Sequence, residues 1–306
     1  MTEKVAAFDI GTNTVLLLVA ERGPDGPRSA LERAEITRLG RGVDKTKRLD
    51  ADAIARTLAA LERFAGEARA LGVTRVAAVG TSASRDAENG AEFRARAAEI
   101  LGGTVEIVSG AREAELTFRG ALGGLGITGS HVAVIDVGGG STEIVVGQDD
   151  AIVFAHSYDV GSVRLTERHV PTDPPTPEAL AAVHAAASET YAAPKPPTGP
   201  FDAVVAIAGT ATTYAAIELG IARYEESPPH GARLSLDALE KRIASLAALP
   251  LAARAQVVGL DAKRADVIVA GGIVLLEAAR SLGAREIVIS DRGVRWGLAD
   301  ELLRAP

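Results

Sequence analysis

The chain has 306 residues, of which 47% are hydrophobic, 24% are charged and 4% are aromatic. This length favours two domains, and this composition is that of a globular protein with a core of Val, Ile, Leu and Ala. The net charge of −7 argues against a nucleic-acid partner, and the lack of cysteine excludes disulfides and Cys-ligated metals. The start lacks a signal-peptide pattern and no apolar stretch approaches ~18 residues, so we expect a cytoplasmic protein that does not bind membranes.

Apolar runs rich in Val and Ile alternate along the chain with Ala- and Leu-rich segments of helical period, which predicts an α/β fold. The first half is expected to contain strands at Val5–Ile10, Val15–Ala20, Val76–Val79 and Val105–Val108 and helices at Ala51–Leu71, Ala91–Leu101 and Glu113–Ala121. The second half is expected to contain strands at Val132–Ile135, Ile144–Val146, Val204–Ile207 and Ile287–Ile289 and helices at Glu178–Tyr191, Leu236–Leu249 and Asp266–Leu282.

A glycine-rich stretch at Gly123–Gly126 precedes a fresh strand and marks the expected domain junction. The sequence therefore predicts one domain of residues 1–125 and a second of residues 126–306, whose last helix could pack back on the first domain.

Two segments of the chain resemble each other, about a domain length apart, and each places an Asp at the end of an apolar strand. The first is centred on Asp9 and the second on Asp136. Small residues after each Asp let backbone N–H groups approach an anion, and a strand-end carboxylate beside phosphate oxygens suits Mg²⁺. Two ordinary hairpins are the alternative, and neither segment matches the Walker pattern. The phosphate-loop candidates are Gly11, Thr12, Asn13 and Thr14 in the first segment and Gly138, Gly139, Gly140 and Ser141 in the second, with Asp9 and Asp136 as metal ligands.

A third turn of small residues begins at Gly209, between the strand at Val204–Ile207 and a helix. A helix N-terminus there could hold an anion, which makes Gly209 and Thr210 further candidates for phosphate binding. The alternative is a simple capping turn in which Thr210 or Thr212 caps the helix.

A charged loop at Arg41–Arg48 carries four basic residues and one acidic residue. It could guide a longer polyanion, although a solvated loop explains it equally well. The five histidines show no metal-ligand spacing.

The ordered set of motifs resembles the exopolyphosphatase / guanosine pentaphosphate phosphohydrolase (Ppx/GppA) family, from Val5 to Leu298. The resemblance implies two ribonuclease-H-like domains of the actin-like ATPase superfamily, with the active site in the cleft between them. It also implies a homodimer, and a short form without the C-terminal HD-type domain of the longer members. The motifs are Asp9–Thr14, Thr81–Asn89, Ser109–Leu116, Asp136–Glu143, Gly161–Leu165, Ile207–Thr213, Arg264–Asp266 and Ser290–Leu298.

Three catalytic residues follow from this resemblance. Glu113 matches the glutamate proposed as the general base that activates the attacking water, Glu143 matches a second catalytic carboxylate, and Arg85 matches an arginine that points at the phosphate. Taken without the family, Glu113 would be read as a first-turn residue that stabilises the helix dipole. Glu143 would be read as an exposed strand residue and Arg85 as a surface charge.

The function expected from these residues is Mg²⁺-assisted (or Mn²⁺-assisted) hydrolysis of the terminal phosphoanhydride of inorganic polyphosphate. Guanosine pentaphosphate (pppGpp) 5′-phosphohydrolase is the alternative within the same chemistry. A sugar or acetate kinase on the same fold, and a non-catalytic regulator that binds an alarmone or nucleotide, are alternatives of other classes. We expect no nucleic-acid or membrane partner.

Overall fold

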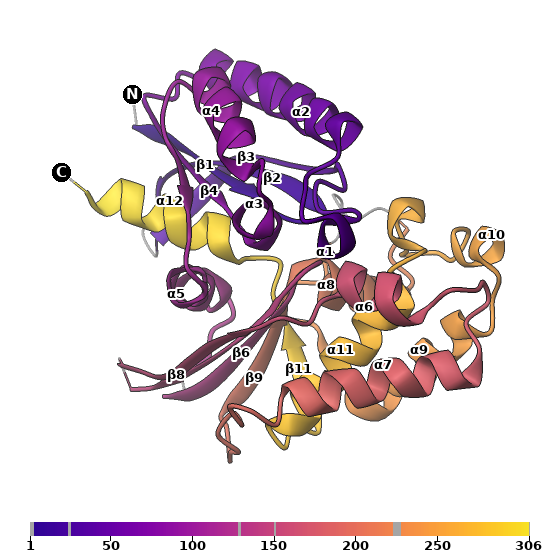
Figure 1. Cartoon of the computed structure of the whole chain (residues 1–306). Coiled ribbons are helices and arrows are strands. Elements are labelled where there is room, and N and C mark those ends of the chain that lie inside the picture. Colours follow the sequence, from indigo (N-terminus) through magenta and orange to yellow (C-terminus); the bar gives the residue numbers. More distant parts are fainter. Residues whose placement is uncertain (1–2, 24–25, 128–129, 150, 223–227, 306) are drawn as a thin grey trace. The chain divides into compact units, whose positions relative to one another are not determined.

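The computed structural model describes residues 3–23, 26–127, 130–149, 151–222 and 228–305 (Figure 1). The chain divides into two compact units: residues up to Gly123 together with those from Val294 on, and residues Gly124–Gly293. The division lies two residues before the expected boundary at 125, and the last helix belongs to the first unit. The second unit accordingly ends at Gly293 and not at residue 306. Within the described residues, no helix is long and apolar enough to cross a membrane.

The first unit is built on a five-stranded sheet with the order β3-β2-β1-β4-β5. Its first three strands are antiparallel, whereas β4 and β5 run parallel to β1. The elements of this unit are β1 (Lys4–Ile10), β2 (Thr14–Gly23), β3 (Gly26–Ile36), α1 (Val43–Thr46), α2 (Ala51–Ala70), β4 (Arg75–Gly80), α3 (Ser82–Asp86), α4 (Gly90–Leu101), β5 (Val105–Ile107), α5 (Gly110–Ala121) and α12 (Val294–Arg304).

The second unit repeats this plan. Its sheet has the order β10-β11-β9-β6-β7-β8, with an antiparallel set of three strands followed by two strands parallel to β6 and one added edge strand. The shared order is the ribonuclease-H-like arrangement, which confirms the predicted fold class. The elements are β6 (His131–Val137), β7 (Thr142–Gln148), β8 (Ala151–Tyr158), α6 (Ser162–His169), α7 (Pro177–Thr190), β9 (Ala203–Ile207), α8 (Ala208–Leu219), β10 (Arg233–Ser235), α9 (Leu236–Ala247), α10 (Leu251–Arg254), the 3₁₀ turn η1 (Ala262–Arg264), α11 (Ile268–Ser281) and β11 (Glu286–Ile289).

Two apolar layers cover the sheet of the first unit. Alternate residues of β1 point to opposite faces, so Phe8 packs in the layer made with α2 and α4, and Ala7 packs in the layer made with α5 and α12. In Figure 1, α2 and α4 lie together, and α12 lies beside α5. The N-terminus of α2 is fixed by Asp50, whose carboxylate accepts a 3.0 Å hydrogen bond from the Ala53 amide.

The predicted strands and helices are all present, with ends that move by at most three residues. The two longest strands that the sequence analysis lacks are β3 and β8, which are edge strands with many exposed positions. The polar pattern of β3 (GPRSALERAEI) has no clear alternation, because none of its side chains is fully buried.

Candidate active site

The turn between β1 and β2 has its carbonyl groups engaged and its amide groups available. The Gly11 amide closes the turn by donating to the Thr14 carbonyl at 3.0 Å, and the carbonyls of Thr12 and Asn13 accept hydrogen bonds of 2.8–3.0 Å from residues 37–40. Within the described residues, the amides of Thr12 and Asn13 donate to no backbone oxygen. The buried side-chain Nδ2 of Asn13 likewise has no hydrogen-bond partner there. Asp9 lies at the end of β1, so the turn offers several N–H donors next to one carboxylate.

Arg85 and Glu113, which are far apart in the sequence, lie together in the first unit. Arg85 Nη1 is 3.6 Å from Glu113 Oε2, and the same nitrogen donates to the Val108 carbonyl at 3.3 Å. Glu113 is only 5% exposed and lies in the first turn of α5, so a role in stabilising the helix dipole stays compatible with its position. Arg85 comes from the short helix α3, where its Nε is also 3.6 Å from Asp86 Oδ1. The two predicted catalytic residues therefore form a partly buried ion pair.

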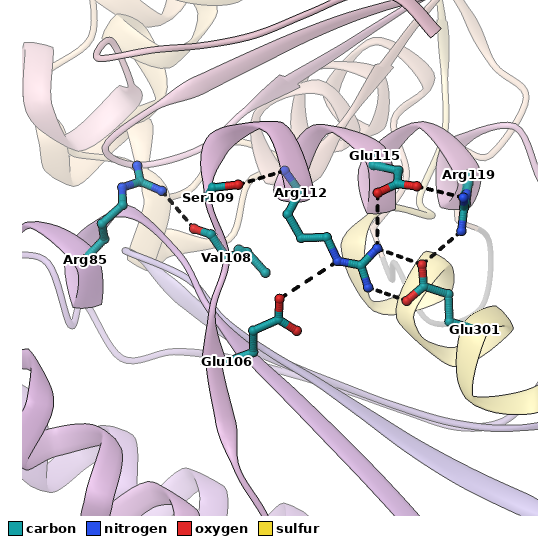
Figure 2. Close-up of polar contacts among 8 residues, drawn as sticks. All are labelled: Arg85, Glu106, Val108, Ser109, Arg112, Glu115, Arg119 and Glu301. Atoms are coloured by element: carbon teal, nitrogen blue, oxygen red, sulfur yellow. Dashed lines mark hydrogen bonds and ion pairs between the residues drawn. The ribbon is translucent and has the colours of Figure 1, made fainter. Parts of the chain in front are cut away.

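The start of α5, which carries Glu113, is fixed by a side-chain cap. Ser109 caps α5, its side-chain oxygen accepting a hydrogen bond from the Arg112 amide at 3.2 Å, and Glu113 lies in the first helical turn. Figure 2 shows that Arg112, the residue before Glu113, instead points toward Glu106, Glu115 and Glu301.

Glu301 on α12 joins two arginines of α5. Arg112 Nη1 donates to Glu301 Oε1 at 2.8 Å, Arg112 Nη2 contacts Oε2, and Arg119 Nη1 donates to Oε1 at 2.9 Å (Figure 2). The hydrogen bonds from Arg112 lower the pKa of Glu301, and burial opposes this shift without cancelling it. Hydrogen bonding to Glu301 in turn raises the pKa of Arg112. The helix that carries Glu113 is thus fastened to α12 by charged hydrogen bonds.

The turn between β6 and β7 repeats the chemistry of the first turn. The Gly138 amide donates to the Ser141 carbonyl at 3.0 Å, and residues 162–164 donate 2.9–3.1 Å hydrogen bonds to the carbonyls of Gly138 and Gly139. Arg164 Nε donates to the Gly140 carbonyl at 2.7 Å. No backbone acceptor within the described chain is paired with the amides of residues 139–141. The carbonyls are therefore occupied and the N–H groups are free to meet an anion.

Gly161 brings α6 against this turn. A Cβ at position 161 would lie 2.5 Å from the Gly139 oxygen, a distance that real side chains do not tolerate. Only glycine therefore lets the first turn of α6 approach closely enough to hold the three glycine carbonyls.

Two carboxylates lie next to each other in the second unit. Asp136 on β6 and Glu143 on β7 are directly opposite in the antiparallel pair, and they are 9% and 1% exposed. Opposite residues share one face of the sheet with Cβ atoms about 4.5–5.5 Å apart. Glu143 Oε1 accepts a 2.5 Å hydrogen bond from the Ser157 hydroxyl on β8. The alternative of an exposed strand glutamate is therefore wrong.

The donor set fits a hard cation that keeps part of its water shell. Mg²⁺ is usually held by one or two carboxylates together with waters and substrate phosphate, and Asp136 with Glu143 supplies such a pair. In the described ranges, no group of three or more His, Asp or Glu residues gathers as a ligand set, as a zinc site would require.

The third turn begins with an alanine in the left-handed region, Ala208 at φ 66°. Its helix α8 has Ile207 at the N-cap position without a side-chain cap, so neither Thr210 nor Thr212 caps it and the capping alternative is wrong. Thr212 instead donates back to the Ala208 carbonyl at 3.1 Å, and Gly209 packs against the guanidinium of Arg264. The uncapped N-terminus leaves backbone amides that suit an anion.

The sequence analysis missed three polar residues of these sites. Ser157 bonds to Glu143 from a strand that the sequence pattern did not reveal, Arg164 holds a glycine carbonyl, and Ser84 has a buried hydroxyl without a partner in the described structure. Arg164 and Ser84 had a usable signal, because they lie inside the Gly161–Leu165 and Thr81–Asn89 motifs.

Comparisons with known proteins show which family the chain belongs to. The model of the Ppx/GppA phosphatase family matches residues 18–305. The chain belongs to this family. Among curated relatives, Exopolyphosphatase 2 of Mycobacterium tuberculosis is 38% identical over an alignment of 312 positions that covers 97% of each chain.

Solved structures of this Ppx/GppA type superpose on the whole chain. An exopolyphosphatase-like protein aligns with a TM-score of 0.92 at 31% identity, covering 98% of this chain and 99% of its own. An exopolyphosphatase from Cytophaga hutchinsonii aligns with a TM-score of 0.87 at 26% identity, covering 98% of both chains. The fold of this Ppx/GppA chain is therefore that of the family along its full length.

Proposed function

We propose that this Ppx/GppA family member is an exopolyphosphatase, which hydrolyses the terminal phosphoanhydride bond of inorganic polyphosphate and releases orthophosphate. The observation that carries the proposal is the partly buried pair of Arg85 and Glu113. Such a pair offers a carboxylate for a water and a guanidinium for a phosphate within one small region. The substrate class is supported by the likeness to the mycobacterial exopolyphosphatase over nearly all of both chains.

In this mechanism Glu113 orients a water molecule and takes its proton as the water oxygen attacks the terminal phosphorus. The bond from that phosphorus to its bridging oxygen breaks, and the shortened chain leaves with the electron pair on that oxygen. Arg85 donates to the phosphoryl oxygens and stabilises the negative charge that spreads over them in the transition state. The contact with Arg85 also holds the Glu113 side chain in place.

The turn residues bind phosphate through backbone amides. The available N–H groups of Thr12 and Asn13 in the first unit, and of Gly139 and Gly140 in the second, donate to phosphate oxygens. Gly209 and Thr210 act in the same way at the uncapped start of α8.

We assign Mg²⁺ as the cofactor, with Mn²⁺ as an accepted substitute, because carboxylates and water are the ligands that both ions prefer. Asp136 and Asp9 would hold the ion directly or through water, and Glu143 would orient its shell. When bound, the ion neutralises charge on the phosphate oxygens.

Guanosine pentaphosphate 5′-phosphohydrolase is the second candidate, since a relative from Vibrio cholerae that matches 54% of this chain is named a guanosine-5′-triphosphate,3′-diphosphate pyrophosphatase. Both substrates end in a phosphoanhydride. A homodimer stays a prediction of the family resemblance, and a cytoplasmic location stays a prediction from the sequence pattern.

The test is orthophosphate release by the wild-type protein from tripolyphosphate, long-chain polyphosphate, guanosine pentaphosphate and ATP, with and without Mg²⁺. We expect Mg²⁺-dependent release from polyphosphate, with a kcat/KM at least about tenfold above the values for guanosine pentaphosphate and ATP. A tenfold ratio corresponds to a free-energy difference of about 1.4 kcal/mol. Release only from guanosine pentaphosphate would transfer the function to the second candidate. Folded protein that binds these compounds but hydrolyses none would support the non-catalytic regulator.

A further inference from the structure

A hollow of about 640 Å³ lies in the first unit, outside the two turns. It is formed by α1, the loop after α1 and the first turns of α2. Three arginines line it, Arg41, Arg48 and Arg56, together with the carboxylates of Asp50 and Asp52. This volume lies within the range typical of ligand sites, about 300–1,000 Å³.

The hollow is locally basic in an acidic protein. Residues 41–56 contain five basic and three acidic side chains, whereas the whole chain carries a net charge of −7. One of the carboxylates, Asp50, is engaged in capping α2. The segment thus offers a surplus of cations over a short stretch, which favours a polyanion.

Each of the three arginines has N–H groups that are available to bind a ligand. Within the described ranges Arg41 has no carboxylate partner. Arg48 meets only Glu88 at 3.4 Å, in a pair whose side chains are 60% and 68% exposed and which is therefore weak. Arg56 uses its Nε to hold the Thr37 carbonyl at 3.2 Å, which leaves its two terminal nitrogens.

The hollow is fixed directly beside the first phosphate turn. The Gly40 amide donates to the Thr12 carbonyl at 2.8 Å, and Arg41 is the next residue. A Cβ at position 40 would collide with the Thr12 side chain and lie 3.0 Å from Ala83 of α3, so glycine permits this close approach. At the other end, Asn89 exchanges hydrogen bonds of 2.8 and 3.0 Å with the backbone of Leu49.

We propose that this hollow is a second phosphate subsite, which binds phosphates of the polyphosphate chain upstream of the one that is cleaved. The inference rests on the proposed function and deepens it, because it names Arg41, Arg48 and Arg56 as the residues that favour long chains over short ones. Arginine suits this task since its planar fork binds phosphate oxygens in pairs. The lining contains no aromatic side chain on which a nucleobase could stack, so a repeating phosphate chain fits it better than a nucleotide.

The test compares Arg41→Gln/Arg48→Gln with wild type through the ratio of kcat/KM for long-chain polyphosphate to kcat/KM for tripolyphosphate. We expect the ratio to fall about tenfold or more, because each arginine contributes charge-assisted hydrogen bonds only to the longer chain. The slope of log KM against log salt for the long chain should become shallower by about one to two. A ratio is independent of the active fraction of each preparation.

A matched control is Arg33→Gln/Arg63→Gln, which removes two exposed arginines of the same unit that pair with Glu67 and Glu35. We expect its ratio to stay within about twofold of wild type, whereas an equal fall in both double variants would overturn the subsite by showing a general charge effect. An unchanged ratio in Arg41→Gln/Arg48→Gln, with wild type active on both substrates, would also overturn it.

Should wild type hydrolyse neither substrate, the proposed function fails, and equilibrium binding of long-chain polyphosphate then decides the inference. Binding that weakens about tenfold in Arg41→Gln/Arg48→Gln but not in the control supports the subsite. Equal binding by both double variants, or no binding by wild type, overturns it.

Discussion

At the scale of single residues, Glu143 depends on a neighbour that holds its orientation. Its carboxylate is buried opposite Asp136, and Ser157 donates a 2.5 Å hydrogen bond to it from the adjacent strand. Removing a hydrogen-bond partner of a metal-binding carboxylate typically costs about 10–100-fold in metal affinity.

We therefore expect Ser157→Ala to raise the Mg²⁺ concentration needed for half-maximal phosphate release by about 10–100-fold. The free energy of unfolding should fall by about 1 kcal/mol, because one partly buried hydrogen bond is lost. The matched control is Ser188→Ala, which removes a 2.9 Å hydrogen bond to the carboxylate of Glu277 in the same unit. It should lose less stability, because this hydrogen bond is exposed, and it should keep the Mg²⁺ dependence of wild type. An equal Mg²⁺ dependence in both variants would remove Ser157 from the site.

Single residues of the site could be predicted where a sequence motif marks them, but not where their role depends on a contact that only the fold creates. Glu113 and Arg85 were reached through family motifs, and the structure brings them within 3.6 Å of each other. Ser157 could not be found, because its contact with Glu143 depends on the register of an edge strand that the sequence pattern does not specify. Arg41 was noticed as part of a basic loop, but only the fold shows that this loop lies against Thr12.

At the scale of elements, α5 and α12 form one charged and tightly packed pair. Glu301 accepts hydrogen bonds from both Arg112 and Arg119, and Trp296 of α12 is only 6% exposed in the apolar layer below. Trp296 is the single tryptophan of the chain, so its fluorescence reports on this element pair during unfolding.

We expect Glu301→Gln to lower the free energy of unfolding at pH 7 by about 1 kcal/mol, since a partly exposed carboxylate loses its charged hydrogen bonds. The pKa of Glu301 lies below its usual 4.5 in the folded protein, so this stabilisation is complete above pH 4.5 and is lost as the pH falls through the folded-state pKa. Urea unfolding, followed by Trp296 fluorescence, should thus show a difference in free energy of unfolding between wild type and variant. This difference should be largest at pH 7 and should shrink below pH 4.5.

The control for this experiment is Glu67→Gln, which breaks the exposed ion pair with Arg33 and should cost less than about 0.5 kcal/mol at either pH. If the difference in free energy of unfolding between wild type and Glu301→Gln stayed constant from pH 7 to pH 3, the carboxylate charge would not be what holds α12 in place.

Buried helices and strands were the elements that the sequence predicted well. Central strands such as β1 and β6 are nearly continuous apolar runs, because both faces of the sheet are covered. The short helices α3 and α6 were missed, since each is shorter than the period analysis needs. Each is held by a contact with a turn, α3 through Ser82 and Thr12 and α6 through Ser162 and Gly138.

At the scale of the whole molecule, the chain builds its first unit from both of its ends. The strands of the early sequence bury Val5 and Leu18 against Trp296, Leu298 and Leu303 of the last helix. The two similar segments centred on Asp9 and Asp136 allowed two similar domains to be predicted. The assignment of α12 to the first unit was raised only as a possibility, because no local pattern states which sheet a terminal helix covers.

We expect a chain that ends at Gly293 to be insoluble or to bind a hydrophobic dye strongly, because each large apolar side chain of α12 contributes about 1.5–3 kcal/mol through burial. Removing only residues 305–306 is the control and should leave solubility unchanged. A soluble truncated chain with the urea midpoint of the intact protein would refute the packing role of α12.

The central claim is that Glu113 activates the water that releases orthophosphate from polyphosphate. The most direct measurement is single-turnover release of orthophosphate from polyphosphate by wild type and Glu113→Gln, with binding of the same substrate measured in parallel. The account predicts a rate about 10²–10⁴-fold lower for Glu113→Gln, with binding retained within a few-fold, since general-base catalysis contributes on that order. A variant that releases orthophosphate as fast as wild type would contradict it.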